Sequence, residues 1–189
     1  MQLRRLLYSF RLMIVLIVLA SVTHHAAGQT LNFKQFTVNN GLLSSTVYFT
    51  YQDSKGYMWF ATEAGVNRFD GRTFESFTVD DGLSDNEILW IQEDSQHRIW
   101  FLTLSGQLSF YKNGKFYNPS NHPLLKKAVT RSSFVSFFED SKKRIWLGTN
   151  QQDVVMIGNS RVTHYTLPSK LLLANSFVVE DNNGTIWVL

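Results

Sequence analysis

Beyond residue 30 the chain alternates between short apolar runs and polar punctuation. In the first unit, runs rich in β-branched and aromatic residues are followed by turns of Gly, Asp, Asn and Ser; they cover Val47–Gln52, Met58–Thr62, Val66–Phe69 and Thr73–Val79. This pattern is typical of consecutive antiparallel hairpins. No segment here sustains a helical period, and Leu124–Val129 predicts one helical turn at most.

The same pattern recurs at a fixed period. An Asp followed by four residues, then Met or Ile, then Trp occurs four times, with the tryptophans 41, 46 and 41 residues apart. The repeated residues are Asp53 and Trp59, Asp94 and Trp100, Asp140 and Trp146, and Asp181 and Trp187. Four-stranded units of this period are typical of the blades of a β-propeller.

We therefore predict an all-β fold, a partial β-propeller of about three and a half four-stranded blades. The predicted blades cover residues 47–79, 87–118 and 133–166, with a half blade at 176–189 and a lone strand at 33–38. Each repeat Trp is expected to fill the space between neighbouring blades, because a lone blade cannot bury both faces. Propellers close with about 4–8 blades, so we interpret the chain as an N-terminal fragment of a longer protein whose 33–38 strand completes the last blade.

The third repeat contains five extra residues, which lie near Asn118–Ser132. This stretch holds Pro119, Pro123 and several basic residues. We interpret it as a solvated loop or linker on one face of the ring, with a binding loop as the alternative.

Residues 1–28 have the organisation of a secretory signal peptide. Arg4, Arg5 and Arg11 precede the apolar stretch Leu12–Val22, and small residues stand before Gln29. This predicts export with cleavage after Gly28. The alternative is a retained anchor, but eleven helical residues span about 16 Å and a bilayer core needs roughly 30 Å.

Charge and cysteine content narrow the classes of function. The chain has 18 Lys and Arg against 15 Asp and Glu, but the leader supplies the excess and the remainder is neutral. A neutral folded part lacks the positive charge that binding to nucleic acid requires, so no nucleic-acid partner is expected. With no Cys, disulfides and thiolate metal sites are excluded.

Candidate chemistry in the sequence is sparse. The repeated Asp is interpreted as the acceptor of an Asx-type turn rather than a calcium ligand, because lysines occupy the adjacent positions. No nucleophile elbow or phosphate loop occurs, and the acids of Asp80–Glu87 are interpreted as a solvated loop. Solvated roles are also expected for His97, His122 and His164. No catalytic, metal or cofactor site is predicted, and the ligand site is unknown. Trp90 faces either the inter-blade core or the axial channel.

The repeats resemble the two-component regulator propeller repeats. The resemblance rests on Gly41-Leu42, Gln52-Asp53-Ser54, Trp59–Thr62 and Gly65–Gly71, and on the equivalent residues of the second unit; it extends over residues 32–189, although the third unit lacks the Gly-Leu pair. It implies the periplasmic sensor region of a bacterial histidine-kinase-type receptor, anchored in the inner membrane only by parts missing from this chain.

The resemblance makes ligand sensing in a two-component signalling receptor the leading function. It implies an unidentified small-molecule or glycan ligand, no cofactor, a periplasmic or extracellular location and, as one arrangement, a dimeric full-length receptor. A secreted propeller that binds a partner protein or glycan without signalling is the alternative. A propeller enzyme is the third class, for which the sequence offers no carboxylate or histidine constellation.

Overall fold

The computed structural model describes residues 13–14, 33–151, 153–166 and 175–189. The predicted signal peptide and its cleavage site after Gly28 lie outside the described residues, apart from Met13 and Ile14. The chain divides into a unit of residues 1–35 and a unit of residues 36–189, which holds all the β-strands of the described part.

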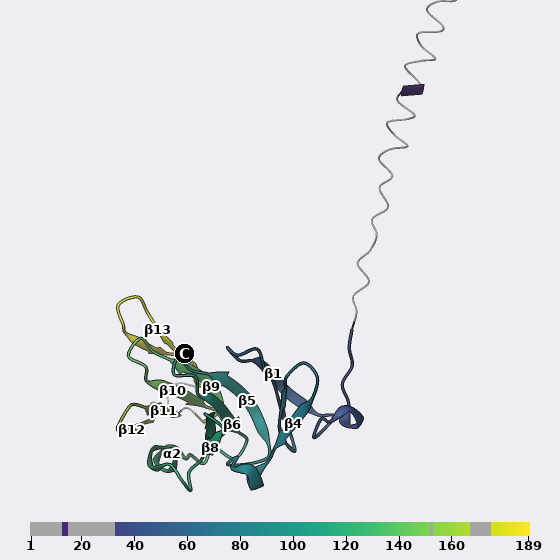
Figure 1. Cartoon of the computed structure of the whole chain (residues 1–189). Coiled ribbons are helices and arrows are strands. Elements are labelled where there is room, and N and C mark those ends of the chain that lie inside the picture. Colours follow the sequence, from purple (N-terminus) through teal and green to yellow (C-terminus); the bar gives the residue numbers. More distant parts are fainter. Residues whose placement is uncertain (1–12, 15–32, 152, 167–174) are drawn as a thin grey trace, which may run out of the picture. The chain divides into compact units, whose positions relative to one another are not determined.

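The described strands of the second unit form three four-stranded sheets and one two-stranded hairpin, all antiparallel (Figure 1). The first blade contains β1 (Val47–Gln52), β2 (Met58–Thr62), β3 (Gly65–Phe69) and β4 (Phe74–Phe77). The second contains β5 (Ile88–Glu93), β6 (Ile99–Thr103), β7 (Leu108–Lys112) and β8 (Lys115–Tyr117). The third contains β9 (Phe134–Glu139), β10 (Ile145–Thr149), β11 (Asp153–Ile157) and β12 (Val162–Thr166). The hairpin pairs β13 (Val178–Glu180) with β14 (Ile186–Val188).

Within every sheet the strands follow sequence order, so each blade is a simple meander. Blade 1 contacts blade 2 near its first strand, where β1 and β2 meet β5, and blade 3 contacts the hairpin in the same way, where β9 and β10 meet β13. Three four-stranded meanders followed by half of a fourth are the architecture of a partial β-propeller.

The core consists of clusters between blades, and the repeat tryptophans belong to them. Trp59 lies in the cluster shared by blades 1 and 2, Trp100 in that of blades 2 and 3, and Trp146 in that of blade 3 and the hairpin. Each is at most 6% exposed. Ile99 and Ile145, one residue before the tryptophan, join the preceding cluster because neighbouring side chains of a strand point to opposite faces.

The inter-blade role predicted for the repeat Trp is confirmed in the three complete blades. It is wrong for Trp187, which is 54% exposed. The reason is geometric: Trp187 points to the face of the hairpin opposite to Ile186 and Val188, which pack against blade 3, and no described blade covers that face.

The strand predicted at residues 33–38 is not present. Residues 33–37 are irregular, and Val38–Asn40 form a 3₁₀ helix, η1. Thr37 and Asn40 close a reciprocal capping interaction, in which the Asn40 side chain accepts the Thr37 backbone N–H. A second helix of the same kind, η2 (Val79–Asp81), precedes the second blade and is capped by Thr78 and Asp81. The motif that resembled a strand is therefore a capped turn that leads the chain into a blade.

The insertion of the third repeat is not a solvated loop, which corrects the sequence-based interpretation. It contains helix α2 (Pro123–Ala128), longer than the single turn expected, whose Leu125 and Ala128 are fully buried. Both belong to the cluster between blades 2 and 3. The helix contacts β7, β11 and β12, so the extra residues cover the outer edge of an inter-blade core.

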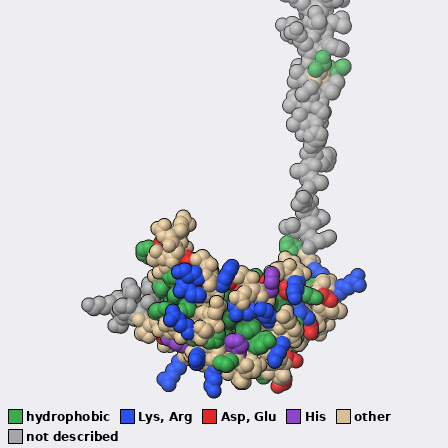
Figure 2. Space-filling model, turned by 60° about the vertical axis from the view of Figure 1, so that its left-hand side comes forward, with side chains coloured by type: hydrophobic (Ala, Val, Ile, Leu, Met, Phe, Trp, Pro, Cys, Tyr) green, Lys and Arg blue, Asp and Glu red, His purple; other side chains and the backbone are tan. Residues whose placement is uncertain are grey.

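In the described part, no helix is both long enough and apolar enough to cross a bilayer. Figure 2 shows one face of the molecule, on which Lys and Arg side chains gather across the middle, with hydrophobic side chains between them.

Candidate functional site

The repeat Asp and Trp form one structural unit in every blade. The indole Nε1 of the tryptophan donates to the Oδ2 of the aspartate six residues earlier, at 2.7–2.8 Å. The pairs are Trp59 and Asp53, Trp100 and Asp94, Trp146 and Asp140, and Trp187 and Asp181. The carboxylate thereby satisfies the only polar atom of a ring that is buried in the first three pairs.

The other carboxylate oxygen of the same Asp holds the hairpin turn. Asp53 Oδ1 accepts the backbone N–H groups of Lys55 and Tyr57 at 3.0 and 2.9 Å, and the remaining three aspartates repeat this pattern. The Asx-type turn predicted from the sequence is confirmed. Each of the four aspartates accepts at least three hydrogen bonds from its own turn and tryptophan, so these side chains fix the structure of the turn.

A guanidinium group lies over the buried repeat tryptophan in the three complete blades. In blades 2 and 3 it comes from Arg98 and Arg144, two residues before the Trp, and its Nε contacts Oδ2 of the repeat Asp at 2.5 Å. In blade 1 that position is Tyr57, and the guanidinium comes from Arg68 on β3. Arg68 bonds Glu75 and the Tyr111 hydroxyl instead of the repeat Asp.

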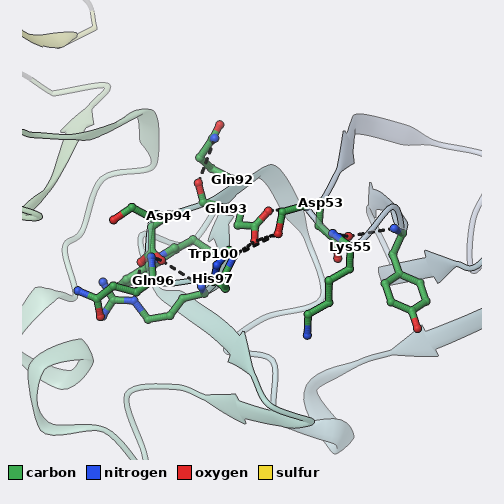
Figure 3. Close-up of polar contacts among 12 residues, drawn as sticks. Asp53, Lys55, Gln92, Glu93, Asp94, Gln96, His97 and Trp100 are labelled. Carbon is green, nitrogen blue, oxygen red and sulfur yellow. Dashed lines mark hydrogen bonds and ion pairs between the residues drawn. The ribbon is translucent and has the colours of Figure 1, made fainter.

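A second repeated contact joins neighbouring blades, and the sequence reasoning missed it. The backbone N–H and the hydroxyl of Ser54 both donate to the carboxylate of Glu93 in the next blade, each at 2.6 Å. Figure 3 labels Glu93 together with Asp53 and Lys55, the two sequence neighbours of Ser54. The same bidentate contact joins Ser95 to Glu139 and Ser141 to Glu180, at 2.6–2.8 Å. In the recurring Glu-Asp-Ser triplet, the Glu bonds a Ser of the preceding blade, the Asp bonds the Trp of its own blade, and the Ser bonds a Glu of the following blade. The recurrence of this triplet was the sequence signal for the contact. We name these three contacts the Ser–Glu clamps.

The carboxyl of Glu93 has a pKa below its ordinary value. Burial raises the pKa, but the hydrogen bonds from Ser54 and His97 outweigh this effect. The pKa of Asp140 is likewise lowered, because hydrogen bonds from Trp146 and Arg144 outweigh its burial. The hydrogen bonds of the Ser–Glu clamp and of the turn therefore stabilise the ionised form of these two carboxyls.

His97 and His164 are exposed, in agreement with the solvated roles predicted for them, although each also has a polar contact; His122 is half-buried, which differs from the prediction. The ring of His97 is 69% exposed, but its Nδ1 lies 2.9 Å from Glu93 and 3.1 Å from Ser54 Oγ, at the edge of the clamp. His122 is half-buried, with its ring edge-on to Phe110 and Tyr117, and burial lowers its pKa. His164 Nε2 lies 2.7 Å from the backbone oxygen of Lys127.

Trp90 lies at the inner side of blade 2, where its ring stacks on Phe49 of blade 1 with centroids 4.2 Å apart. It is half-buried and packs against the cluster between blades 2 and 3. Of the two placements considered, the inter-blade core is the one observed. Its Nε1 is buried and has no hydrogen-bond partner.

A cleft of about 140 Å³ opens between blades 1 and 2, on the face that carries the β1–β2, β5–β6 and β7–β8 turns. Its walls carry three cationic side chains, Lys55, Arg68 and Lys112, together with the aromatic rings of Tyr57 and Tyr111. Asp53, Glu93 and His97 also line it. Within the described residues no group of three or more His, Asp or Glu side chains is placed to hold a metal ion. The cationic and aromatic side chains on its walls make the cleft a candidate binding site.

The fold defines the class of the protein as a β-propeller. Three segments, residues 41–64, 82–105 and 130–151, match the family described as "Two component regulator propeller". Each begins just before the first strand of a blade and ends at or soon after the end of its second strand. These three segments are thus similar to the repeats of that family.

The chain is similar to several known proteins, in each case over only part of that protein's length. A protein named "Histidine kinase P4" from Formosa agariphila is 36% identical over 61 residues, which are 32% of this chain and 4% of that protein. The extracellular domain of a putative hybrid two-component system from B. thetaiotaomicron has a TM-score of 0.66 at 19% identity, covering 85% of this chain and 22% of that one. A virginiamycin B lyase from Staphylococcus aureus has a TM-score of 0.61 at 18% identity, covering 85% and 54%. These structural likenesses establish the propeller fold alone.

Proposed function

We propose that the chain is the extracytoplasmic ligand-sensing propeller region of a two-component signal transduction receptor. The observation that carries the proposal is the match of three successive repeats to the regulator propeller family. The similarity to a histidine kinase supports the same class of receptor, although this chain spans only 4% of that relative's length. In this reading the propeller contributes ligand binding, and the kinase reaction belongs to another part of the receptor.

The inter-blade contacts supply a physical route from ligand to output. Each Ser–Glu clamp and each buried tryptophan joins one blade to the next, so neighbouring blades resist independent movement. A ligand that bridges loops of several blades would therefore shift the arrangement of these blades together. It changes the output only if it binds two arrangements of the receptor with unequal affinity.

The proposal is tested by reading the coding DNA downstream of Leu189 and by measuring autophosphorylation in membranes of the source bacterium. We expect a membrane-spanning helix followed by a kinase region, and a change of autophosphorylation when the codons for residues 36–189 are deleted in frame. A secreted product without a membrane-spanning segment would contradict the receptor and favour the alternative, a propeller that binds a partner protein or glycan without signalling.

The proposed location has its own test. Export with cleavage after Gly28 predicts that the protein recovered from the periplasm or the medium begins at Gln29. Recovery of intact Met1 in the membrane fraction would contradict cleavage and favour the retained anchor.

A further inference from the structure

The cleft between blades 1 and 2 differs from the equivalent position between blades 2 and 3 in the charges at its mouth. Lys55 stands two residues after the repeat Asp of blade 1, where blade 2 has Gln96. Lys112 follows Tyr111 on β7, and the strand pairing places Gly158 at the corresponding position of blade 3. The first cleft therefore has two lysines where the second has none at either position.

The two carboxylates that line the cleft are fully engaged in holding the blades. Asp53 accepts two backbone N–H groups and the Trp59 indole, and Glu93 accepts both donors of Ser54 and contacts His97. Neither Lys55 nor Lys112 forms a salt bridge with a described residue. The ammonium groups are thus available to a ligand, while the nearby negative charges are already stabilised by hydrogen bonds.

Arg68 adds a third cation to the cleft wall, in a position that the other blades do not use. Arg98 and Arg144 are tied to the repeat Asp of their own blades, whereas Arg68 reaches the tryptophan from the neighbouring strand. Its guanidinium is held between the Tyr57 and Tyr111 rings, with centroids 4.7 and 5.5 Å away. Its guanidinium has five N–H donors, of which the salt bridge to Glu75 and the hydrogen bond to the Tyr111 hydroxyl use two, so Arg68 offers the ligand its remaining N–H donors, whereas the lysines offer unpaired charges.

We propose that this cleft is a binding site for an oxyanion, namely a sulfate or phosphate group, held by Lys55, Lys112 and Arg68. The volume of about 140 Å³ exceeds several times the roughly 30 Å³ that a liquid water molecule occupies, which suits a tetrahedral oxyanion and part of what carries it. The flanking Tyr57 and Tyr111 rings would contact the group that bears the anion. The proposal rests on the geometry of blades 1 and 2 and does not depend on whether the protein is a receptor.

The experiment uses the purified 189-residue chain at low micromolar concentration and constant ionic strength. Its probes are sodium sulfate, sodium phosphate, glucose 6-sulfate and unsulfated glucose, each titrated against a sodium chloride reference and followed by tryptophan fluorescence and isothermal titration calorimetry. We expect saturable binding of sulfate and phosphate beyond that of chloride. Tighter binding of glucose 6-sulfate than of inorganic sulfate would assign an ester group as the ligand, and equal or weaker binding would assign a free anion.

Matched variants locate the binding. Lys55→Gln introduces the residue that blade 2 has naturally at this position, so the turn is expected to fold unchanged. Lys55→Gln and Lys112→Gln should each weaken sulfate binding about threefold, and the double variant about tenfold, as expected for partly exposed ion pairs. Lys142→Gln is the control, because it removes the same charge from the equivalent exposed turn of blade 3.

Circular dichroism and the melting temperature verify that each variant is folded. The proposal is overturned if sulfate and phosphate bind no better than chloride. It is equally overturned if Lys142→Gln weakens binding as much as the double variant does, because the effect then comes from total charge and not from the cleft.

Discussion

At the scale of the residue, burial of the repeat tryptophan decides how much each blade depends on it. Trp100 is 1% exposed and joins two blades, while Trp187 is 54% exposed with the same bond to its repeat Asp. Trp100→Ala should therefore lower the free energy of unfolding by about 3–5 kcal/mol. Trp187→Ala, the matched control, should lower it by less than about 1 kcal/mol. Urea unfolding of both variants measures the difference, and equal losses would show that the hydrogen bond outweighs burial.

The lowered pKa values of Glu93 and Asp140 predict a loss of stability in acid. Ordinary Glu and Asp side chains titrate near about 4.3 and 3.9. Because the folded protein holds these carboxyls at a lower pKa, the unfolded chain takes up protons first as the pH falls. Their contribution is complete above about pH 5 and decreases as the pH drops toward the lowered values.

Urea unfolding at a series of pH values between 7 and 3 measures this dependence. Glu93→Gln serves as the comparison, since it removes one of the carboxyls with a lowered pKa and should make the decrease in acid shallower. Stability that stays constant from pH 5 to 3 would contradict the assignment of these carboxylates.

At the scale of the element, the Ser–Glu clamps predict an energetic coupling between neighbouring blades. In a double-mutant cycle, Ser54→Ala and Glu93→Gln should show a coupling of about 1 kcal/mol, because a charged acceptor loses a donor that it holds at 2.6 Å. The cycle of Ser54→Ala with Glu139→Gln is the control, since Glu139 bonds Ser95 instead. Its coupling should stay within about 0.5 kcal/mol. Equal couplings in the two cycles would mean that the clamp is not specific.

Gly148 on β10 marks the closest approach between blade 3 and the segment that leads into β13. A Cβ at this position would lie 1.7 Å from the backbone oxygen of Ser176. Gly148→Ala should therefore destabilise the fold by about 1–3 kcal/mol or more and increase hydrogen exchange in the β13–β14 hairpin. Gly158→Ala is the control, because its nearest contacts would be 3.6 Å away. An equal effect of the two substitutions would contradict the steric explanation.

At the scale of the whole molecule, apolar surface is concentrated at the β13–β14 hairpin. Phe177, Trp187 and Leu189 are 49–58% exposed, on the face of the hairpin opposite to Ile186 and Val188, which pack against blade 3. Contiguous exposed apolar surface and an unguarded strand edge favour association. The purified 29–189 chain should therefore associate reversibly as its concentration rises.

Sedimentation velocity at increasing concentration measures this association. Phe177→Lys combined with Leu189→Lys should shift the chain toward monomer, because two charges then oppose contact at the hairpin. Val79→Lys replaces an apolar side chain of similar exposure on η2 and is the control. A chain that stays monomeric at high concentration would contradict the prediction.

The sequence alone determined the period of the repeat, the four-stranded form of the blades and the composition of the cores between them. This was possible because a strand alternates its side chains, and a recurring Asp and Trp at fixed spacing mark the same turn and the same buried ring in each of the three complete blades. The same reasoning was wrong at residues 33–38, where a local capping interaction of Thr37 and Asn40 replaces a strand that has no partner in the described residues.

Only the tertiary structure decided which groups from different blades meet. Ser54 and Glu93 are 39 residues apart, and Leu125 of the insertion fills a core that the pattern of prolines and lysines did not indicate. Lys55, Arg68 and Lys112 likewise come from three separate strands or turns and converge on one cleft. Spacing within a strand records which face a side chain occupies. The recurring Glu-Asp-Ser triplet marks the residues of the Ser–Glu clamps, but their partners on the facing blade depend on how the blades are stacked.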